Sequence, residues 1–190
     1  MNEMNSDFAA DAYQAADERS SKLNLNIFLA ELGRLKRIMA GFGLSVQDGE
    51  DVLQDVSIKA LKHFEKYRNR EDSIRWLIKV TVNRCLMEHR RRRSFRRRVG
   101  EILKRWSENK TASKRTDEKV IVAEELEIVR ESLQELDNSL LGPTILRYFC
   151  DFNSKEVGEI LGLNPSTVRS RLREARMILA KRLLERGVEP

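Results

Sequence analysis

Six polar and basic side chains at the start of one predicted helix have the types and spacing that bind nucleic acid. The stretch 165–182 holds six lysines and arginines and a single acid, Glu174. A guanidinium group can form two parallel hydrogen bonds to a guanine edge, and a hydroxyl group can bind a phosphate oxygen. This face fits the major groove of DNA, although a solvated basic face has the same composition. The six residues are Ser166, Thr167, Arg169, Ser170, Arg171 and Arg173.

A helix-turn-helix is the element that must hold this face. Ser154 is a suitable N-cap for a short first helix, and Gly162 can supply the left-handed C-cap that ends it. Asn164 and Pro165 then restart the chain as N-cap and first helical residue. In this motif the second helix enters the major groove, but paired helices also occur in all-α proteins that bind no DNA. The second helix has an apolar stripe opposite its polar face, formed by Val168, Leu172, Ala175, Leu179 and Leu183.

A run of arginines forms a second basic feature. Residues 90–98 contain seven arginines in nine positions, within a chain of net charge +6. Such density favours a polyanionic partner, and nucleic acid is the first candidate. A nuclear import signal or a solubilising surface would have the same composition.

Residues that could form a metal or catalytic site are few and poorly spaced. Cys85 and Cys150 lack Cys-x-x-Cys spacing, and neither His63 nor His89 has a ligand partner one helical turn away. We therefore expect reduced thiols in a cytoplasmic protein that holds no metal or cofactor. The absence of a phosphate-binding loop and of a Ser/His/Asp set predicts that the chain is not an enzyme. No stretch approaches the ~20 apolar residues that cross a bilayer, so neither membrane insertion nor a signal peptide is expected.

The order of apolar and polar stretches predicts an all-α fold of two small helical domains joined by a flexible linker. Residues 1–22 are acidic and polar and are expected to be disordered. Residues 23–98 form the first helical domain, and the polar stretch 99–120 is the expected linker. Residues 121–187 form the second domain, a four-helix domain that contains the helix-turn-helix.

Helical periodicity predicts four elements before the helix-turn-helix. They run over about 24–40, from about Ser45 to Phe64, from Ser73 through the arginines, and over about 121–136, while Gly142 and Pro143 are expected to interrupt the next. The positions expected to face the core are Ile27, Leu32 or Phe28, Leu35, Met39, Val52, Val56, Ala60, Leu61, Phe64, Leu77, Val80, Thr81, Arg84 or Cys85, and Met87.

Two separated groups of motifs resemble one family. Together they are similar to bacterial RNA polymerase sigma factors of the sigma-70 family, extracytoplasmic-function type. The first group resembles sigma domain 2 and the second resembles sigma domain 4, in the order that the family has. The motifs are Glu50–Val56, Trp76–Val80 and Asn83, followed by Leu146–Phe149, Glu156–Gly162 and Ser166–Arg176.

For residues 121–187 the resemblance implies the role of domain 4, which reads the −35 promoter element. Arg169, Ser170 and Arg173 match positions that face the bases. Thr167 and Arg171 match positions closer to the phosphates. The resemblance also implies contact with the β flap of core RNA polymerase, and it makes an anti-sigma factor a further candidate partner.

For residues 23–98 the resemblance implies the role of domain 2, which binds polymerase and opens the −10 element of promoter DNA. The implied contacts with the β′ clamp helices come from the polar face of the second helix. A base flipped from the non-template strand would lie between an aromatic ring, a guanidinium group and an amide, and the arginine run would neutralise upstream phosphates. The polymerase-binding residues are Asp51, Gln54 and Asp55, and the −10 residues are Tyr67, Arg68, Asn83, Arg90 and Arg91.

Two other functions use part of the same features. A helix-turn-helix regulator of the response-regulator output type would explain the C-terminal domain but not residues 50–83. An RNA-binding or scaffolding protein would use the arginine run alone and leave the helix-turn-helix without a role. Binding to core polymerase in the absence of DNA separates a sigma factor from both.

Overall fold

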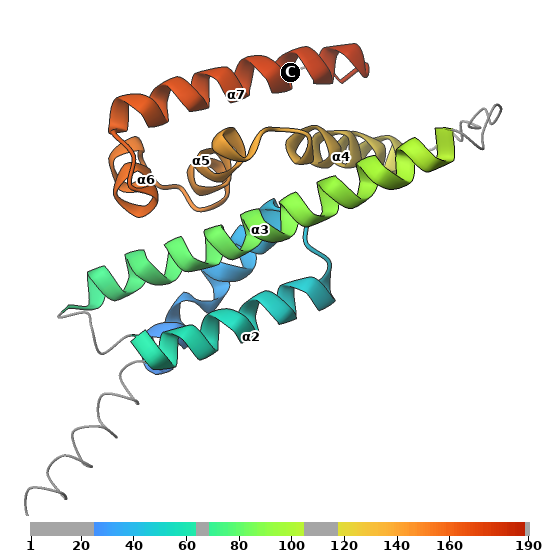
Figure 1. Ribbon diagram of the computed structural model, residues 1–190. Helices are drawn as coiled ribbons and strands as arrows, with labels where there is room; N and C mark the ends of the chain where they lie inside the picture. Colours follow the sequence, from blue (N-terminus) through green and yellow to red (C-terminus); the bar gives the residue numbers. More distant parts are fainter. Residues whose placement is uncertain (1–24, 64–68, 105–117, 189–190) are drawn as a thin grey trace, which may run out of the picture.

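The computed structural model describes residues 25–63, 69–104 and 118–188, with side chains outside 96–104 and 118–124. Every regular element in these ranges is an α-helix (Figure 1), which confirms the predicted all-α class. An unlabelled helix over 25–41 comes first. It is followed by α2 (Val46–His63), α3 (Arg70–Lys104), α4 (Glu118–Gln134), α5 (Asn138–Phe149), α6 (Ser154–Leu161) and α7 (Pro165–Glu185).

Helix α3 is the central element. Its 35 residues span about 52 Å. It packs against α2 on one side and against α5 and α6 on another (Figure 1). We call the helix over 25–41 with α2 and α3 the N-terminal module, and α4 to α7 the C-terminal module. The two predicted modules are thus in contact, with α3 of the N-terminal module packed against α5 and α6 of the C-terminal module.

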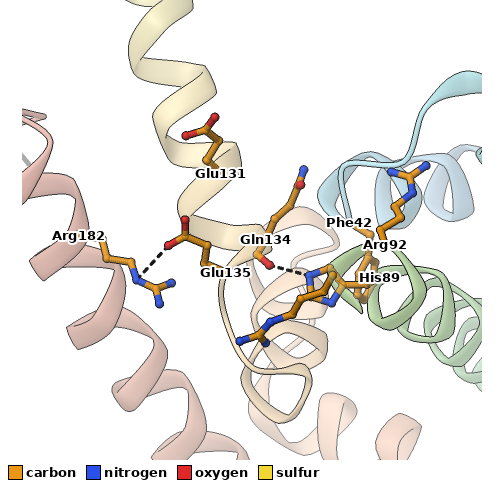
Figure 2. A pocket seen from close by; sticks show the side chains of 8 residues that line it. Phe42, His89, Arg92, Glu131, Gln134, Glu135 and Arg182 are labelled. Atoms are coloured by element: carbon orange, nitrogen blue, oxygen red, sulfur yellow. Dashed lines mark hydrogen bonds and ion pairs between the residues drawn. The ribbon is translucent and has the colours of Figure 1, made fainter. Parts of the chain in front are cut away.

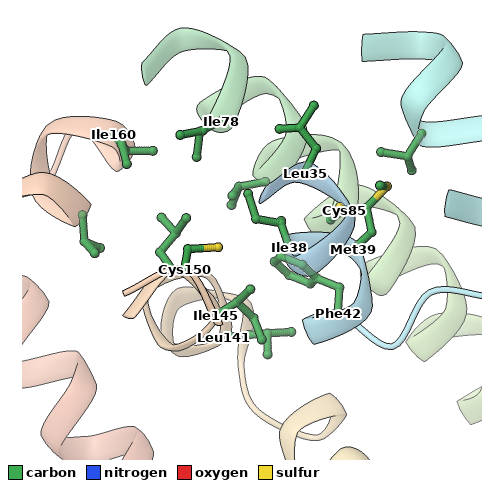
Figure 3. Packing of buried hydrophobic residues seen from close by; sticks show 14 of the residues in the cluster. Leu35, Ile38, Met39, Phe42, Ile78, Cys85, Leu141, Ile145, Cys150 and Ile160 are labelled. Atoms are coloured by element: carbon green, nitrogen blue, oxygen red, sulfur yellow. The ribbon is translucent and has the colours of Figure 1, made fainter. Parts of the chain in front are cut away.

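Buried apolar side chains from both modules form one continuous cluster (Figure 3). Two predicted core positions are wrong, because Leu61 is 56% exposed and Met87 is 60% exposed. Ile78 and Val82, which were not predicted, are buried in their place on α3. A helix that packs on two sides needs two apolar stripes. The prediction assumed one stripe on α3 and therefore assigned some of its buried positions wrongly. The predicted positions confirmed as buried are Ile27, Leu35, Met39, Val52, Val56, Ala60, Leu77, Thr81 and Cys85.

The expected interruption at Gly142 and Pro143 is also wrong, because α5 continues through both residues. Proline removes one backbone donor, which would have bonded the carbonyl four residues earlier, at Ser139. Ser139 lies exposed in the first turn of α5, where water can satisfy that carbonyl. Gly142 is buried beside α3, where an added Cβ would make ordinary van der Waals contact at 3.7 Å with Leu86 and with Val82.

The helix-turn-helix forms with one change at its start. The N-cap of α6 is Asn153 rather than Ser154, and Asn153 forms a capping box with Glu156. Gly162 ends α6 in the left-handed conformation, with φ of 70°, as predicted. Asn164 caps α7 and accepts from the Ser166 N–H, with Pro165 as the first helical residue.

The domain boundaries stay predictions in part. Helix α3 continues to Lys104 and α4 begins at Glu118, so both helices extend into the expected linker, 99–120. The rest of that linker, 105–117, lies outside the described residues, as does the acidic segment 1–22.

Candidate nucleic-acid and polymerase interfaces

The first turns of α7 hold the predicted DNA-reading face on a fixed support. Val168 and Leu172 are buried beneath it. Arg169, Ser170 and Arg173 are exposed on the other side. Of the remaining predicted residues, Ser166 is exposed, and Thr167 and Arg171 are half-buried. The helix presents its polar side outward because its apolar side is held in the core.

A tight turn fixes α7 against α6. The Leu163 N–H donates to the Gly158 carbonyl at 2.8 Å. A Cβ added to Gly158 would lie 2.6 Å from the Leu163 carbonyl oxygen, so only glycine fits there without a backbone shift. The orientation of the reading face is therefore determined by backbone contacts as well as by side-chain packing.

Arg169, Arg171 and Arg173 have no internal acid as a partner among the residues that the structure describes. Their guanidinium groups can therefore turn to a ligand without first breaking an ion pair. This availability is what direct reading of base edges requires.

The arginines of α3 have different partners. Glu88, whose side chain is only 6% exposed, lies 2.9 Å from Arg91, 3.4 Å from Arg84 and 3.7 Å from Arg92. Arg84 also donates to Asp55 of α2 at 2.6 Å. These ion pairs join α2 to α3 around one nearly buried carboxylate.

The same network shifts two protonation equilibria. The hydrogen bond to Asp55, opposed by partial burial, raises the pKa of Arg84 above its ordinary value. At the far end of α2, a hydrogen bond from Ser45 and then the positive charge of Arg92 lower the pKa of Asp48. Arg92 also pairs with Asp48 and donates to the Gly43 carbonyl at 3.1 Å. Both shifts favour the charged forms that hold the helices together.

The predicted −10 residues are only partly brought together. Asn83 and Arg90 are exposed on α3. Arg91 is exposed but pairs with Glu88. Tyr67 and Arg68 lie outside the described residues, so the proposed base pocket rests on Asn83 alone within the described part of the chain.

The predicted polymerase-binding residues lie along one helix, α2. Asp51 and Gln54 are exposed, whereas Asp55 is half-buried and bonded to Arg84. Beside them is a feature that the sequence reading missed, an apolar groove of about 470 Å³ between α2 and the helix over 25–41. Val46, which is 81% exposed, lies at its edge. The groove is lined by Leu32, Lys36, Met39, Ala40, Leu44, Ser45, Val46, Gly49, Glu50 and Leu53.

A second cavity, of about 620 Å³, lies where the two modules meet (Figure 2). Its acids are already paired, since Glu135 lies 3.5 Å from Arg182 and 3.0 Å from Arg186. No group of acids, histidines and cysteines suited to a metal ion occurs among the described residues. In the same part of the chain, no helix has the length and apolarity to cross a membrane.

Comparison with known proteins assigns the two modules separately. The family model for sigma-70 region 2 matches residues 27–95, and that for sigma-70 region 4 matches residues 145–179. The chain belongs to the sigma-70 family of RNA polymerase sigma factors. Within that family it is of the extracytoplasmic-function type. The region 2 match covers the segment that a response-regulator output domain leaves unexplained, so that alternative is not favoured.

Named relatives agree with this assignment. The chain is 29% identical to RNA polymerase sigma factor SigV of Bacillus subtilis over 140 residues, which is 73% of this chain and 78% of SigV. It is 25% identical to sigma factor YlaC of the same organism over 138 residues, 73% of this chain and 79% of YlaC.

Two solved structures share the fold. The sigma factor RpoE, solved with the anti-sigma factor NepR from Bartonella quintana, has a TM-score of 0.54 and 18% identity over 85% of this chain and 94% of RpoE. CnrH, solved with the cytosolic domain of CnrY, has a TM-score of 0.58 and 20% identity over 89% of this chain and 94% of CnrH.

Proposed function

We propose that this sigma factor binds core RNA polymerase and directs it to promoters whose −35 element is read by α7. The observation that carries this proposal is that Arg169 and Arg173 are exposed, with no acidic partner among the described residues, on a helix whose opposite side is buried. Arg169, Ser170 and Arg173 would contact base edges. Thr167 and Arg171, which are half-buried, would contact phosphates.

The N-terminal module would act on the −10 element. Asn83 has an amide suited to hydrogen-bond the edge of an unstacked base, and Tyr67 and Arg68 would stack on it. Arg90 would contact phosphates directly. Arg91 can do so while paired with Glu88, because a guanidinium group has five N–H donors and its contact with Glu88 does not use all of them.

Polymerase binding would use α2. Asp51 and Gln54 would contact the β′ clamp helices, with the neighbouring apolar groove adding buried surface. Asp55 would act chiefly by holding Arg84 and thereby orienting α2 on α3. The β flap would contact the C-terminal module.

A protein regulator is the remaining partner that we propose. Both fold relatives described above were solved as complexes, RpoE with an anti-sigma factor and CnrH with the cytosolic domain of CnrY. An anti-sigma factor would act on this chain in the cytoplasm, where the promoters are. The chain acts as an initiation factor, and polymerase supplies the catalysis.

In vitro transcription with core polymerase and a promoter library tests the proposal. We expect transcripts from a subset of promoters that share −35 and −10 sequences. Arg173→Ala should reduce discrimination between −35 sequences. Asn83→Ala should impair strand opening, as measured by permanganate footprinting of the −10 region. Lys181→Ala, at the far end of α7, is the matched control and should change neither. The proposal fails if Asn83→Ala opens promoters like the wild type while Arg173→Ala keeps full −35 selectivity.

A further inference from the structure

One side of α3 stays exposed, although α2, α5 and α6 pack against the rest of the helix (Figure 1). Asn83, Met87 and Arg90 lie on that side, and each of them is exposed. Residues three and four positions apart are neighbours on one face of an α-helix, so these side chains form a single row. The row is about 10 Å long from Asn83 to Arg90.

Met87 is the apolar member of this row, and it is 60% exposed. It lines a cavity of about 530 Å³ between α2 and α3, where its described neighbours are all charged. A single exposed methionine needs no special role in a folded protein. The place of Met87 in the row, between two residues proposed to contact promoter DNA, is what indicates a role. The other residues that line the cavity are Asp55, Lys59, Arg84, Glu88 and Arg91.

The charges beside Met87 favour an anionic partner. The nearly buried Glu88 carboxylate lies 3.4 Å from Arg84 and 2.9 Å from Arg91. The carboxylate of Asp55 accepts a hydrogen bond from Arg84 at 2.6 Å. Both acids in the lining of the cavity are therefore compensated by arginines. A phosphate backbone can approach Met87 without meeting an uncompensated carboxylate in this lining.

The contacts proposed at the two ends of the row place DNA over Met87. In the function proposed above, Asn83 binds an unstacked base and Arg90 binds a phosphate further upstream. Met87 lies between them, about 6 Å from Asn83 along the axis of α3. Successive nucleotides of one strand are about 3.4 Å apart, so this distance corresponds to about two nucleotides. DNA that reaches from Asn83 to Arg90 therefore passes Met87 at the base pairs just upstream of the opened region.

The chemistry of methionine limits what it can distinguish on a base pair. Its thioether has no N–H or O–H donor and is only a weak acceptor, so it cannot form the hydrogen bonds by which arginine or asparagine reads a base. The apolar group that base pairs display in the major groove is the C5-methyl group of thymine. The flexible methionine side chain can pack on such a group. Burial of one methyl group corresponds to about fourfold in affinity.

We propose that Met87 is a specificity-determining residue of the N-terminal module, which selects thymine one or two positions upstream of the base bound by Asn83. This inference rests on the sigma function proposed above. It adds to that function a base contact that uses no hydrogen bond.

Uracil lacks only the C5-methyl group of thymine, so exchanging one base for the other tests the contact directly. The experiment uses full-length protein with core polymerase and a promoter selected from the library. The position at which Asn83→Ala loses discrimination defines the register. Each thymine within three base pairs upstream of it is then replaced singly by uracil, on each strand. For the wild type we expect about fourfold weaker binding with uracil at one position and unchanged binding with uracil at the others.

Variants of Met87 assign this effect to its side chain. Met87→Ala should bind the thymine and uracil promoters equally, with about the affinity that the wild type has for the uracil promoter. Met87→Leu keeps an apolar side chain and should keep most of the discrimination. Phe95→Ala is the matched control, because Phe95 is also apolar and 62% exposed on α3 but lies beyond the row. This control should show the wild-type effect of uracil.

Three results would overturn the role of Met87. They are the absence of a thymine preference upstream of the Asn83-dependent position, the full uracil effect in Met87→Ala, and weaker binding of Met87→Ala to core polymerase without DNA, which would place the side chain in a protein interface. Selection that depends on Asn83 but shows no uracil effect would leave the proposed function standing and exclude only the role of Met87. If the protein directs no promoter-specific transcription, the proposed function fails, and the role of Met87 fails with it.

Discussion

Helices α7 and α3 are both rich in arginine, but their guanidinium groups have different partners. On α7, Arg169 and Arg173 are exposed and have no acidic partner among the described residues. On α3, Arg84 and Arg92 reach across to acids of α2 and share Glu88. The difference arises from what lies beside each helix: α2 brings carboxylates to α3, whereas nothing described covers the reading side of α7.

This comparison shows that arginine density alone does not identify a DNA-binding surface. Part of the arginine run stabilises the N-terminal module, so its residues should divide into structural and DNA-binding ones. Arg90 belongs to the second group because it is exposed and forms no ion pair within 4 Å among the described residues, although its charge acts on Asp137. Arg92 belongs to the first group because it pairs with Asp48 and Glu88, and Arg91 can serve both.

The largest expected effect is on the structural side of the comparison. Glu88→Ala should lower the free energy of unfolding by about 3 kcal/mol, because it removes a nearly buried carboxylate that pairs with the largely buried Arg84 and Arg92 and with the exposed Arg91. Urea denaturation measures this change. Glu174→Ala, an exposed acid on α7, should stay within about 0.5 kcal/mol of the wild type. Equal stability of the two variants would remove the distinction between the helices.

On α7 the effect should fall on DNA binding and not on stability. Arg173→Ala should cost about 1–3 kcal/mol on the preferred −35 duplex and relax discrimination at one or two positions. Fluorescence anisotropy with base-substituted duplexes measures both. Arg90→Ala should instead weaken binding to all sequences alike and reduce the salt dependence by about one unit of slope. Sequence-independent weakening by Arg173→Ala would contradict base reading by α7.

The proposed polymerase-binding residues of α2 can likewise be divided into residues that contact the partner and a residue that stabilises the fold. Asp51→Ala with Gln54→Ala should weaken binding to core polymerase by about 1 kcal/mol at unchanged stability, because both side chains are exposed. Asp55→Ala should lower the free energy of unfolding by up to about 1 kcal/mol, because it removes the bond to Arg84. Pull-down with purified core polymerase and thermal melting separate the two effects. Wild-type affinity in the Asp51/Gln54 double variant would exclude this face.

The smallest effect concerns an acid near the unpaired arginines of α3. The backbone N–H of Ser139, and then the charges of Arg93 and Arg90, lower the pKa of Asp137 below 3.8. A lowered carboxyl pKa stabilises the fold at neutral pH, and this stabilisation is lost as the pH falls below about 4. Asp137→Ala should cost about 1 kcal/mol at pH 7 through loss of the α5 N-cap. Asp137→Asn keeps the cap and should mainly flatten the acid decline in melting temperature. An unchanged acid profile in Asp137→Asn would argue against the charge contribution.

Capping and turn residues in the sequence correctly predicted the structural features that depend only on residues close together in the chain. Gly162, Asn164 and Pro165 determined the turn and the start of α7, because left-handed conformation, capping and a fixed proline φ are properties of short segments. The same reasoning failed at Pro143, which is buried within α5 and whose missing N–H leaves only the carbonyl of exposed Ser139 without its helical donor. It also misplaced Met87, because a helix with neighbours on two sides does not follow a single stripe.

The sequence by itself determined the all-helical class, the helix-turn-helix and the family, because each depends on patterns within a few tens of residues. It also predicted a DNA-reading face of six residues, which stays a prediction, and of these the structure finds Ser166, Arg169, Ser170 and Arg173 exposed. Only the tertiary structure decided which arginines are paired, because Asp55 and Arg84 are 29 positions apart and meet through packing of α2 on α3. Likewise, nothing in the sequence around His89 indicates which residues it contacts. Its hydrogen-bond partners, Gln134 and Asn138, lie 45 and 49 residues away along the chain, and packing of the modules brings each to 2.7 Å.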